Sequence, residues 1–270
     1  MFLTTYHNHS VWSDGTASIR QMALAARAAG VSEFGISDHL VAGPRGFFLD
    51  ARGWSMGLTL LDDYAAEALR VKEELSSPEF QVRLGMEVDY FPETWSAVAK
   101  RLARLPLDYV IGAVHFTADF PIDASADYWH RLSLEAQNRV WEQYAARILG
   151  CAREFPCQWL AHLDLAKIYG VAPTVRAREL LSQALEHCAR RGICIEINAA
   201  GLDKFCGAFY PEESLLKEAI DRGVGVLITA DAHAEAQITR HFSELYPMLR
   251  GLGVTRVPSF EQRQIHWHSL

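Results

Sequence analysis

Histidines and carboxylates stand where seven short apolar runs of this chain stop. The runs fall within residues 4–10, 34–40, 83–90, 109–116, 158–165, 194–201 and 226–233. Runs of Val, Ile and Leu of this length, flanked by Gly, are typical of buried parallel strands. Helix-like segments alternate with them, which favours βα units. In a β/α barrel the carboxyl ends of all strands meet at one mouth, so this pattern predicts a barrel with a polar mouth.

The side chains expected at that mouth are eight imidazoles and carboxylates, widely spaced in sequence. They are His7, His9, His39, Glu87, His115, His162, Asp231 and His233. Packed into one small volume, such groups would repel and desolvate one another, whereas cations between them would remove the conflict. The sequence therefore predicts a site for several metal ions.

Composition narrows the class of protein. The 270 residues are 50% hydrophobic and carry a net charge of −7, which argues against a nucleic-acid polymer as partner. No apolar run of about 18 residues and no secretory leader is present, so neither a membrane span nor export is expected. The five cysteines include no C-x-x-C pair, which fits buried thiols in a reducing cytoplasm. Composition leaves the oligomeric state open.

We expect one domain over residues 1–270, because no linker, repeat or low-complexity segment interrupts the chain. Helices are expected over 17–29, 61–75, 94–104, 175–191 and 212–222, and a long segment of mixed polar and apolar residues spans about 126–153. Residues 41–60 are rich in Gly and aromatic residues without clear period, and they predict a loop over the mouth. Residues 257–260 could add one short strand.

His7 and His9 are separated by one residue. On an extended strand such residues face the same side, so both imidazoles can hold one ion. Asp231 and His233 repeat this spacing. Asp14 follows the first pair in a Ser-Asp-Gly turn that could return its carboxylate to the site; the alternative is a helix cap or an Asx turn.

Glu87 ends its apolar run after Gly85, which permits close backbone approach. A glutamate there is costly to bury unless it meets a cation, and its two oxygens suit a bridge between two metals. His39 follows Asp38, which could orient it. His115 and His162 occupy equivalent strand ends, although each alone could be a structural histidine.

Several motifs together carry a resemblance to a known family. They include H-N-H-S-V-W-S-D-G, G-I-S-D-H, G-M-E-V-D-Y-F-P, G-A-V-H-F, A-H-L-D-L-A-K, I-E-I-N-A-A-G-L and A-D-A-H. In this order they resemble the polymerase and histidinol phosphatase (PHP) superfamily, and within it the monofunctional histidinol-phosphatase branch. Ala113 and Ala230 depart from that branch, where Ser is common at both positions.

The resemblance implies a distorted (β/α)7 barrel that holds three divalent metal ions. By matching motif, the first ion would be bound by His7, His9, Glu87 and Asp231. Glu87 would bridge to a second ion held by His115 and His162. A third would be bound by Asp14, His39 and His233. Imidazole and carboxylate donors without thiolates suit Zn, Mn or Fe.

The expected reaction is hydrolysis of a small phosphate monoester, L-histidinol phosphate, by a metal-bridging hydroxide. Glu87, Asp231 and His233 are the candidate catalytic residues. The candidate substrate-binding residues are Lys167, Asn198 and Arg45, with Arg52 as a weaker one. Lys167 could instead be a solvated lysine at a helix end.

Three rival hypotheses remain open. The same site could act on another phosphate ester or a nucleotide. An amidohydrolase-type barrel also carries H-x-H on its first strand. Finally, the chain could be a catalytically inactive PHP-type module that binds or supports a partner.

Overall fold

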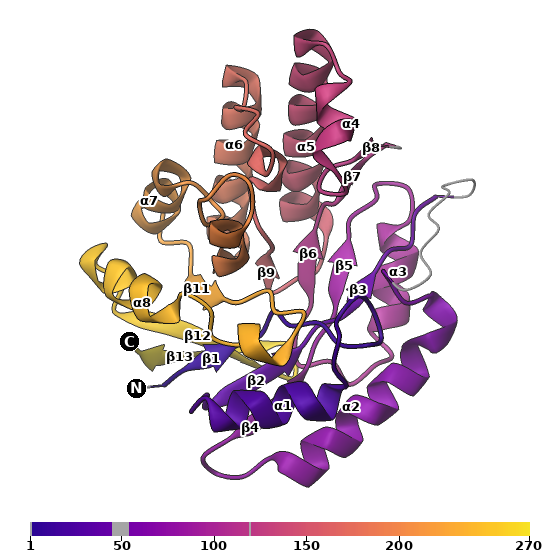
Figure 1. Ribbon diagram of the computed structural model, residues 1–270, viewed down its shortest axis with the longest axis vertical. Helices are drawn as coiled ribbons and strands as arrows, with labels where there is room; N and C mark the ends of the chain where they lie inside the picture. Colours follow the sequence, from indigo (N-terminus) through magenta and orange to yellow (C-terminus); the bar gives the residue numbers. More distant parts are fainter. Residues whose placement is uncertain (1, 45–53, 119) are drawn as a thin grey trace.

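A computed structural model describes residues 2–44, 54–118 and 120–270. Its centre is made of parallel strands in two sheets. One sheet has the order β1 (Thr4–Thr5), β2 (Glu33–Ile36), β4 (Gln81–Leu84). The other has the order β11 (Val226–Thr229), β10 (Cys194–Asn198), β9 (Trp159–Leu160), β6 (Ile111–Ala113), β5 (Glu87–Asp89), β3 (His39–Leu40). Helices surround these strands, and the two termini lie close together (Figure 1).

The two sheets are parts of one ring. β3 continues β2 after a break at residues 37–38, and β5 continues β4 after a break at residues 85–86. Beyond β1, Asn8 forms a parallel bridge with Ala232, which follows β11, and the His9 amide donates to the Ala232 carbonyl over 2.8 Å. Seven strand positions thus succeed one another around the barrel. This confirms the predicted distorted (β/α)7 architecture.

The helices on the outside are α1 (Ile19–Ala28), α2 (Leu61–Leu75), α3 (Trp95–Leu102), α4 (Ala126–His130), α5 (Leu134–Glu154), α6 (Val175–Arg191), α7 (Glu213–Asp221) and α8 (Phe242–Gly251). The predicted helices at 61–75 and 175–191 agree with α2 and α6 residue for residue. The polar-apolar segment at 126–153 forms two helices, because the Ser133 side chain caps a new start at α5 by accepting from the Ala136 amide. Helix α8 was not predicted.

Four single-turn 3₁₀ segments and two hairpins complete the described chain. The 3₁₀ segments are η1 (Leu58–Leu60), η2 (Leu165–Lys167), η3 (Ala199–Asp203) and η4 (Glu235–Gln237). The hairpins are β7 (Phe116–Thr117) with β8 (Phe120–Pro121), and β12 (Arg256–Glu261) with β13 (Gln264–Ser269). The strand expected at 257–260 is therefore confirmed as part of β12.

Aromatic residues fill the barrel at the end opposite the strands' carboxyl ends. Tyr6, Tyr109, Trp159 and Phe260 are fully buried and in mutual ring contact. A Cβ at Gly85 would lie 2.0 Å from the Tyr109 ring, so the predicted close approach at this glycine is made by an aromatic side chain. The aromatic layer closes the barrel and leaves the opposite mouth for the polar residues.

The cysteines, the helices and the expected loop over the mouth can each be compared with the sequence-based expectations. The five cysteines are free, and Cys206 is the one that is partly exposed. Within the described ranges, no helix is long and apolar enough to cross a bilayer. Arg45 and Arg52 of the predicted loop lie outside the described residues. Nearer its end, the Met56 amide donates to the His39 carbonyl.

Candidate metal centre

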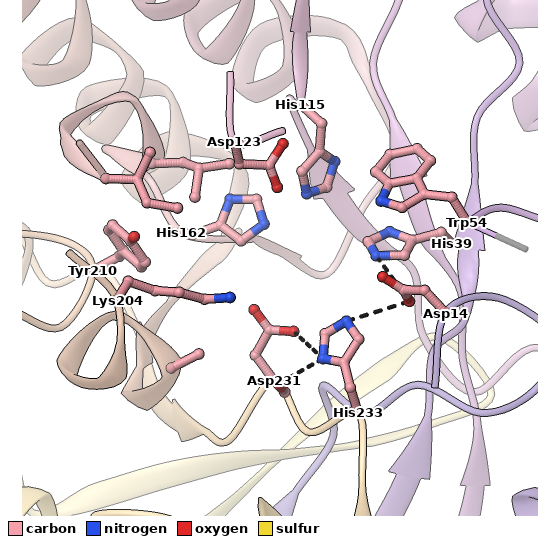
Figure 2. A pocket seen from close by; sticks show the side chains of 13 residues that line it. Asp14, His39, Trp54, His115, Asp123, His162, Lys204, Tyr210, Asp231 and His233 are labelled. Carbon is pink, nitrogen blue, oxygen red and sulfur yellow. Dashed lines mark hydrogen bonds and ion pairs between the residues drawn. The ribbon is translucent and has the colours of Figure 1, made fainter. Parts of the chain in front are cut away.

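All nine predicted metal ligands lie together at the mouth of the barrel, at or just after the strand ends. Six of them line a pocket: Asp14, His39, His115, His162, Asp231 and His233. Figure 2 shows their side chains converging on it. His7, His9 and Glu87 lie beneath and are at most 1% exposed. Parallel register accounts for part of this, since His39 is directly paired with Glu87 across β3 and β5.

The two carboxylate oxygens of Glu87 face different histidines. Oε2 lies 3.1 Å from His7 Nε2, 3.6 Å from His9 Nε2 and 2.8 Å from His39 Nδ1. Oε1 lies 3.1 Å from His162 Nε2. This is the arrangement that a carboxylate bridging two cations requires.

His115 completes the Oε1 side, with its Nε2 3.7 Å from that oxygen. Asp231 belongs to the opposite side: its Oδ1 is 3.2 Å from His9 Nε2 and 3.7 Å from His7 Nε2. Asp231 thus lies close to both histidines of the H-x-H motif, as expected. The Asn8–Ala232 bridge, which joins the first and last strands, brings them together.

Asp14 lies near the two most exposed histidines of the cluster. Its Oδ1 is 3.3 Å from His233 Nε2 and 3.7 Å from His39 Nε2, and both contacts are drawn in Figure 2. The Ser-Asp-Gly turn does therefore return its carboxylate to the site. His9 stacks between His39 and His233, with ring centroids 4.2 and 4.3 Å away.

Many polar atoms of the cluster have no hydrogen-bond partner in the described part of the chain. Among them are His7 Nε2, both nitrogens of His9, Asp14 Oδ1 and Glu87 Oε2. Buried polar atoms are rarely left in this state. Ligands about 2.0–2.2 Å from a zinc ion would be roughly 3–3.5 Å apart, close to the separations found here.

Three groups have one donor atom per residue, all within 4.8 Å of one another. They are His9–Asp14–His39–His233, His7–His9–Glu87 and His39–Glu87–His115. The donor set of imidazoles and carboxylates therefore fits divalent cations. The first group contains the three residues predicted for the third ion together with His9, and the second contains three of the four predicted for the first ion. The last group brings His39, predicted for the third ion, together with Glu87 and His115.

Two buried carboxylates that the sequence analysis did not select orient the histidines. Glu196 Oε2 lies 2.9 Å from His7 Nδ1, and Glu196 Oε1 accepts from the His162 amide. Asp89 accepts from both the amide and Nδ1 of His115, at 2.7 and 2.9 Å. Carboxylates commonly hold metal-binding histidines in this way. Period-two spacing could have revealed Asp89, since Glu87 and Asp89 share one face of β5.

Asp38 was expected to orient His39 or a neighbour. Its carboxylate instead accepts from the Ser10 amide, the Ser10 hydroxyl and the Ser13 hydroxyl, at 2.7, 2.8 and 2.6 Å. Asp38 thus fixes the turn that carries Asp14. Burial raises the pKa of Asp38, and the three donors oppose that shift.

Electrostatics within the cluster push neighbouring histidines in opposite directions. Burial, reinforced by His39 and His233, lowers the pKa of His9 to about 3. Burial also disfavours the charged form of His115, but Asp89 and Glu87 outweigh it and raise the pKa of His115 to about 10. Burial alone would raise the pKa of Glu87, yet His7, His39 and His115 hold it well below its usual range. Glu87 therefore stays ionised.

Two of the predicted ligands adopt left-handed backbone conformations, with φ of 23° at His162 and 49° at Asp231. Such strain in residues other than glycine persists where the surroundings fix it, and it is concentrated at functional sites. Asp231 is held by Asn198, which donates to Oδ2 over 2.9 Å, and by Arg240, which donates to its carbonyl over 2.6 Å.

Two of the predicted substrate-binding residues, Lys167 and Asn198, do not line the pocket. Lys167 Nζ is bound to Asp164 Oδ2 and the Phe209 carbonyl, at 3.0 and 2.8 Å, and does not line the pocket. Asn198 is fully buried and uses its amide group on Glu196 and Asp231. Arg45 lies outside the described residues. These hydrogen bonds hold the side chains of Lys167 and Asn198 in place, and their predicted contact with substrate stays a prediction.

Among the pocket residues that the sequence did not reveal, three stand out. Lys204 and Asp123 project charged groups into the pocket, and Trp54 stacks on His39 with ring centroids 4.8 Å apart (Figure 2). All three stand on loops or turns, where no period predicts the direction of a side chain.

Comparisons with known proteins agree with this geometry. The chain is 30% identical over 250 residues to a probable histidinol-phosphatase of Deinococcus radiodurans, covering 93% of each protein. It is 25% identical over 244 residues to the histidinol-phosphatase of Bacillus subtilis, covering 82% of this chain and 89% of that protein.

A solved structure shares the fold. The histidinol phosphate phosphatase of Lactococcus lactis, crystallised with zinc, L-histidinol and phosphate, superposes with a TM-score of 0.79 at 20% identity, covering 98% of each chain. In addition, the model of the PHP domain family matches residues 5–200. The barrel, its buried donor cluster and these matches together show that the chain belongs to the PHP domain family.

Proposed function

We propose that this protein is a metal-dependent phosphomonoesterase that hydrolyses L-histidinol phosphate to L-histidinol and phosphate. The observation that carries the proposal is the position of Glu87, whose two buried oxygens face two sets of histidine nitrogens. The substrate is taken from the relatives, which are named for this activity over most of the chain.

The residues present fit three divalent ions of Zn, Mn or Fe. His7, His9, Glu87 and Asp231 would hold the first. Glu87, His115 and His162 would hold the second. Asp14, His39 and His233 would hold the third. When bound, such ions supply a hydroxide nucleophile near neutral pH and neutralise charge on the phosphoryl oxygens. With three carboxylates among the ligands, the site keeps a net positive charge that attracts a phosphate dianion despite the acidic chain.

The chain's own residues orient the ligands and the ester. Glu196 and Asp89 fix the rings of His7 and His115. Lys204 lines the pocket, and we assign to it the phosphate contact first expected of Lys167. Asp231 and His233 have side chains 17% and 32% exposed, whereas His7, His9 and Glu87 are at most 1% exposed. Asp231 and His233 are thus accessible for proton exchange with the substrate.

The size of the pocket favours a small ester over a polymer. The cavity volume is about 110 Å³, which is below the roughly 300–1,000 Å³ of pockets for drug-sized ligands. The free cysteines support a reducing cytoplasm as the location of the enzyme.

Phosphate release tests the proposal. Purified protein should hydrolyse L-histidinol phosphate faster than other members of a panel of phosphate esters and nucleotides. A chelator should abolish the activity, and Mn or Zn should restore it. Faster turnover of another ester would overturn the substrate assignment. Absence of turnover in metal-loaded protein would favour the inactive PHP-type module.

Lys204→Ala tests the phosphate contact separately. We expect weaker competitive inhibition by inorganic phosphate, by about tenfold, because one charged hydrogen bond is lost. Lys217→Ala, on the outer helix α7, is the matched control. Unchanged inhibition in the Lys204 variant would remove this residue from the phosphate site.

A further inference from the structure

The pocket contains one carboxylate that neither a metal nor a phosphate explains. In the described part of the chain, Asp14 and Asp231 lie against histidines of the metal cluster, whereas Asp123 is in none of the groups that could hold a metal ion. Asp123 nevertheless lines the same pocket. Figure 2 shows its carboxylate reaching into the pocket from a different wall than Lys204.

The backbone holds Asp123 in place. It follows β8, which pairs with β7 directly after the ligand His115. The Ile122 amide donates to the His115 carbonyl over 2.8 Å, and the Ile122 carbonyl accepts from Trp129 Nε1, also over 2.8 Å. The Asp123 carbonyl accepts from the Tyr169 hydroxyl over 2.5 Å. The position of this residue is thus tied to a metal ligand on one side and to two buried or half-buried aromatic residues on the other.

Charge decides what this carboxylate can recognise. A phosphate dianion in the pocket is repelled by an extra carboxylate, so Asp123 weakens the binding of a plain phosphate ester. A substrate with a cationic group next to its phosphate is attracted instead, because the metal wall and Lys204 meet its anionic end and Asp123 meets its cationic end. L-Histidinol phosphate has such a group, a primary ammonium on the carbon adjacent to the ester CH₂.

Apolar side chains flank these charges and leave space for the rest of the molecule. Trp54, Leu165, Ile168 and Tyr210 line the same pocket as Asp123. Aromatic and aliphatic surfaces of this kind suit the flat imidazole ring of the substrate.

We propose that Asp123 is a specificity-determining residue that binds the ammonium group of the substrate and so selects amine-bearing phosphate esters. This inference deepens the proposed function and rests on it for the identity of the amine. A site that pairs a substrate charge discriminates against an analogue that lacks it, because the half-buried carboxylate is then left unpaired.

The experiment compares Asp123→Asn with wild-type enzyme on two esters, L-histidinol phosphate and the imidazolylpropyl phosphate in which hydrogen replaces the amino group. We expect the variant to lose about 10- to 100-fold in kcat/KM on the amine and less than about threefold on the analogue. Calorimetric affinity for the product L-histidinol should fall by a similar factor. Asp127→Asn, an exposed carboxylate at the start of α4, should behave like wild type.

Metal content is measured in parallel. Equal losses on both esters, or loss of metal in the Asp123 variant, would overturn the inference in favour of a structural or metal-binding role. A wild-type enzyme without preference for the amine would also overturn it.

Failure of the proposed function has a different signature. Wild-type enzyme would then be inactive on L-histidinol phosphate, and aminopropyl phosphate would be compared with propyl phosphate. An amine preference that depends on Asp123 in this second pair would leave the inference standing. Its absence there would refute the inference as well.

Discussion

The two ends of the barrel both bury charged groups, but they satisfy them differently. At the closed end, Arg83 donates to both oxygens of Glu33, at 3.0 Å each, and to Glu261 at 2.7 Å. Tyr6 also donates to Glu33, over 2.8 Å. These charges are saturated by protein partners.

At the mouth, the described residues provide no hydrogen-bond partner for several buried polar atoms. Glu87 Oε2 and His7 Nε2 lie 3.1 Å apart, and neither atom has a hydrogen-bond partner among the described residues. Burial of charged groups alone therefore does not identify a metal site. The closed end, where each charge has a protein partner, stabilises the fold. The mouth, where partners are missing, is suited to bind cations.

The largest expected effect comes from Glu87→Gln. The amide keeps the shape but cannot bridge two cations with two anionic oxygens. We expect kcat on L-histidinol phosphate to fall by at least about a thousandfold, together with loss of bound metal. Assays of phosphate release and elemental analysis of the same preparation measure both.

The matched control at an exposed position is Glu74→Gln, which should keep metal and activity because Glu74 pairs with Arg20 at the surface. A Glu87 variant that kept its metal and turned over substrate would disprove the bridge.

Arg83→Met should do the reverse. It leaves Glu33 buried without its partner, and removing one member of a buried ion pair costs about 3–5 kcal/mol. Urea denaturation should show this loss of unfolding free energy, while the folded fraction keeps its metal and kcat. Arg20→Met, in the exposed pair, should change stability little. If Arg83→Met instead released metal from folded protein, the two ends would not be independent.

Glu196→Gln should have a smaller effect at the mouth. Its carboxylate orients His7 and His162 without being a predicted ligand. Losing such a partner typically costs about 10- to 100-fold in metal affinity or activity. Titration of metal-free protein with Zn in competition with a chromophoric chelator measures the affinity. An unchanged affinity would show that Glu196 matters only for packing.

These contrasts also explain what the sequence could and could not predict. The strand ends were predictable, since His39, Glu87 and Asp231 each follow an apolar run whose period fixes the direction of the side chain. The barrel then brings them together whatever their separation in sequence.

The residues that surround the predicted ligands were harder to predict. Glu196 lies inside its apolar run, where a carboxylate has no distinguishing context until His7 is known to face it. Lys167 and Lys204 show the other difficulty. Lys167 lies in a 3₁₀ turn after one strand, and Lys204 comes just after a 3₁₀ turn that follows another. Only the fold shows that Lys167 pairs with Asp164 and that Lys204 lines the pocket.

The smallest expected effect is a pH dependence of metal affinity. Burial opposes the charging of His115, but Asp89 and Glu87 raise its pKa to about 10, so without metal this histidine binds a proton at neutral pH. Metal must displace that proton. The apparent affinity should therefore rise with pH below about 10, by up to about tenfold per unit for each proton displaced.

Affinities measured between pH 6.5 and 8.5 test this. Asp89→Asn removes the main group that raises the pKa of His115, so its slope should be shallower. Parallel slopes in wild type and variant would locate the displaced proton elsewhere.

If cations bind among the histidines and carboxylates at the mouth of the barrel, the metal content of wild-type protein is the most direct test. Protein purified without chelator and supplied with Zn or Mn should hold close to three divalent ions per chain, and dialysis against a strong chelator should remove them with the activity. Folded protein that retained less than one ion per chain under these conditions would contradict the account.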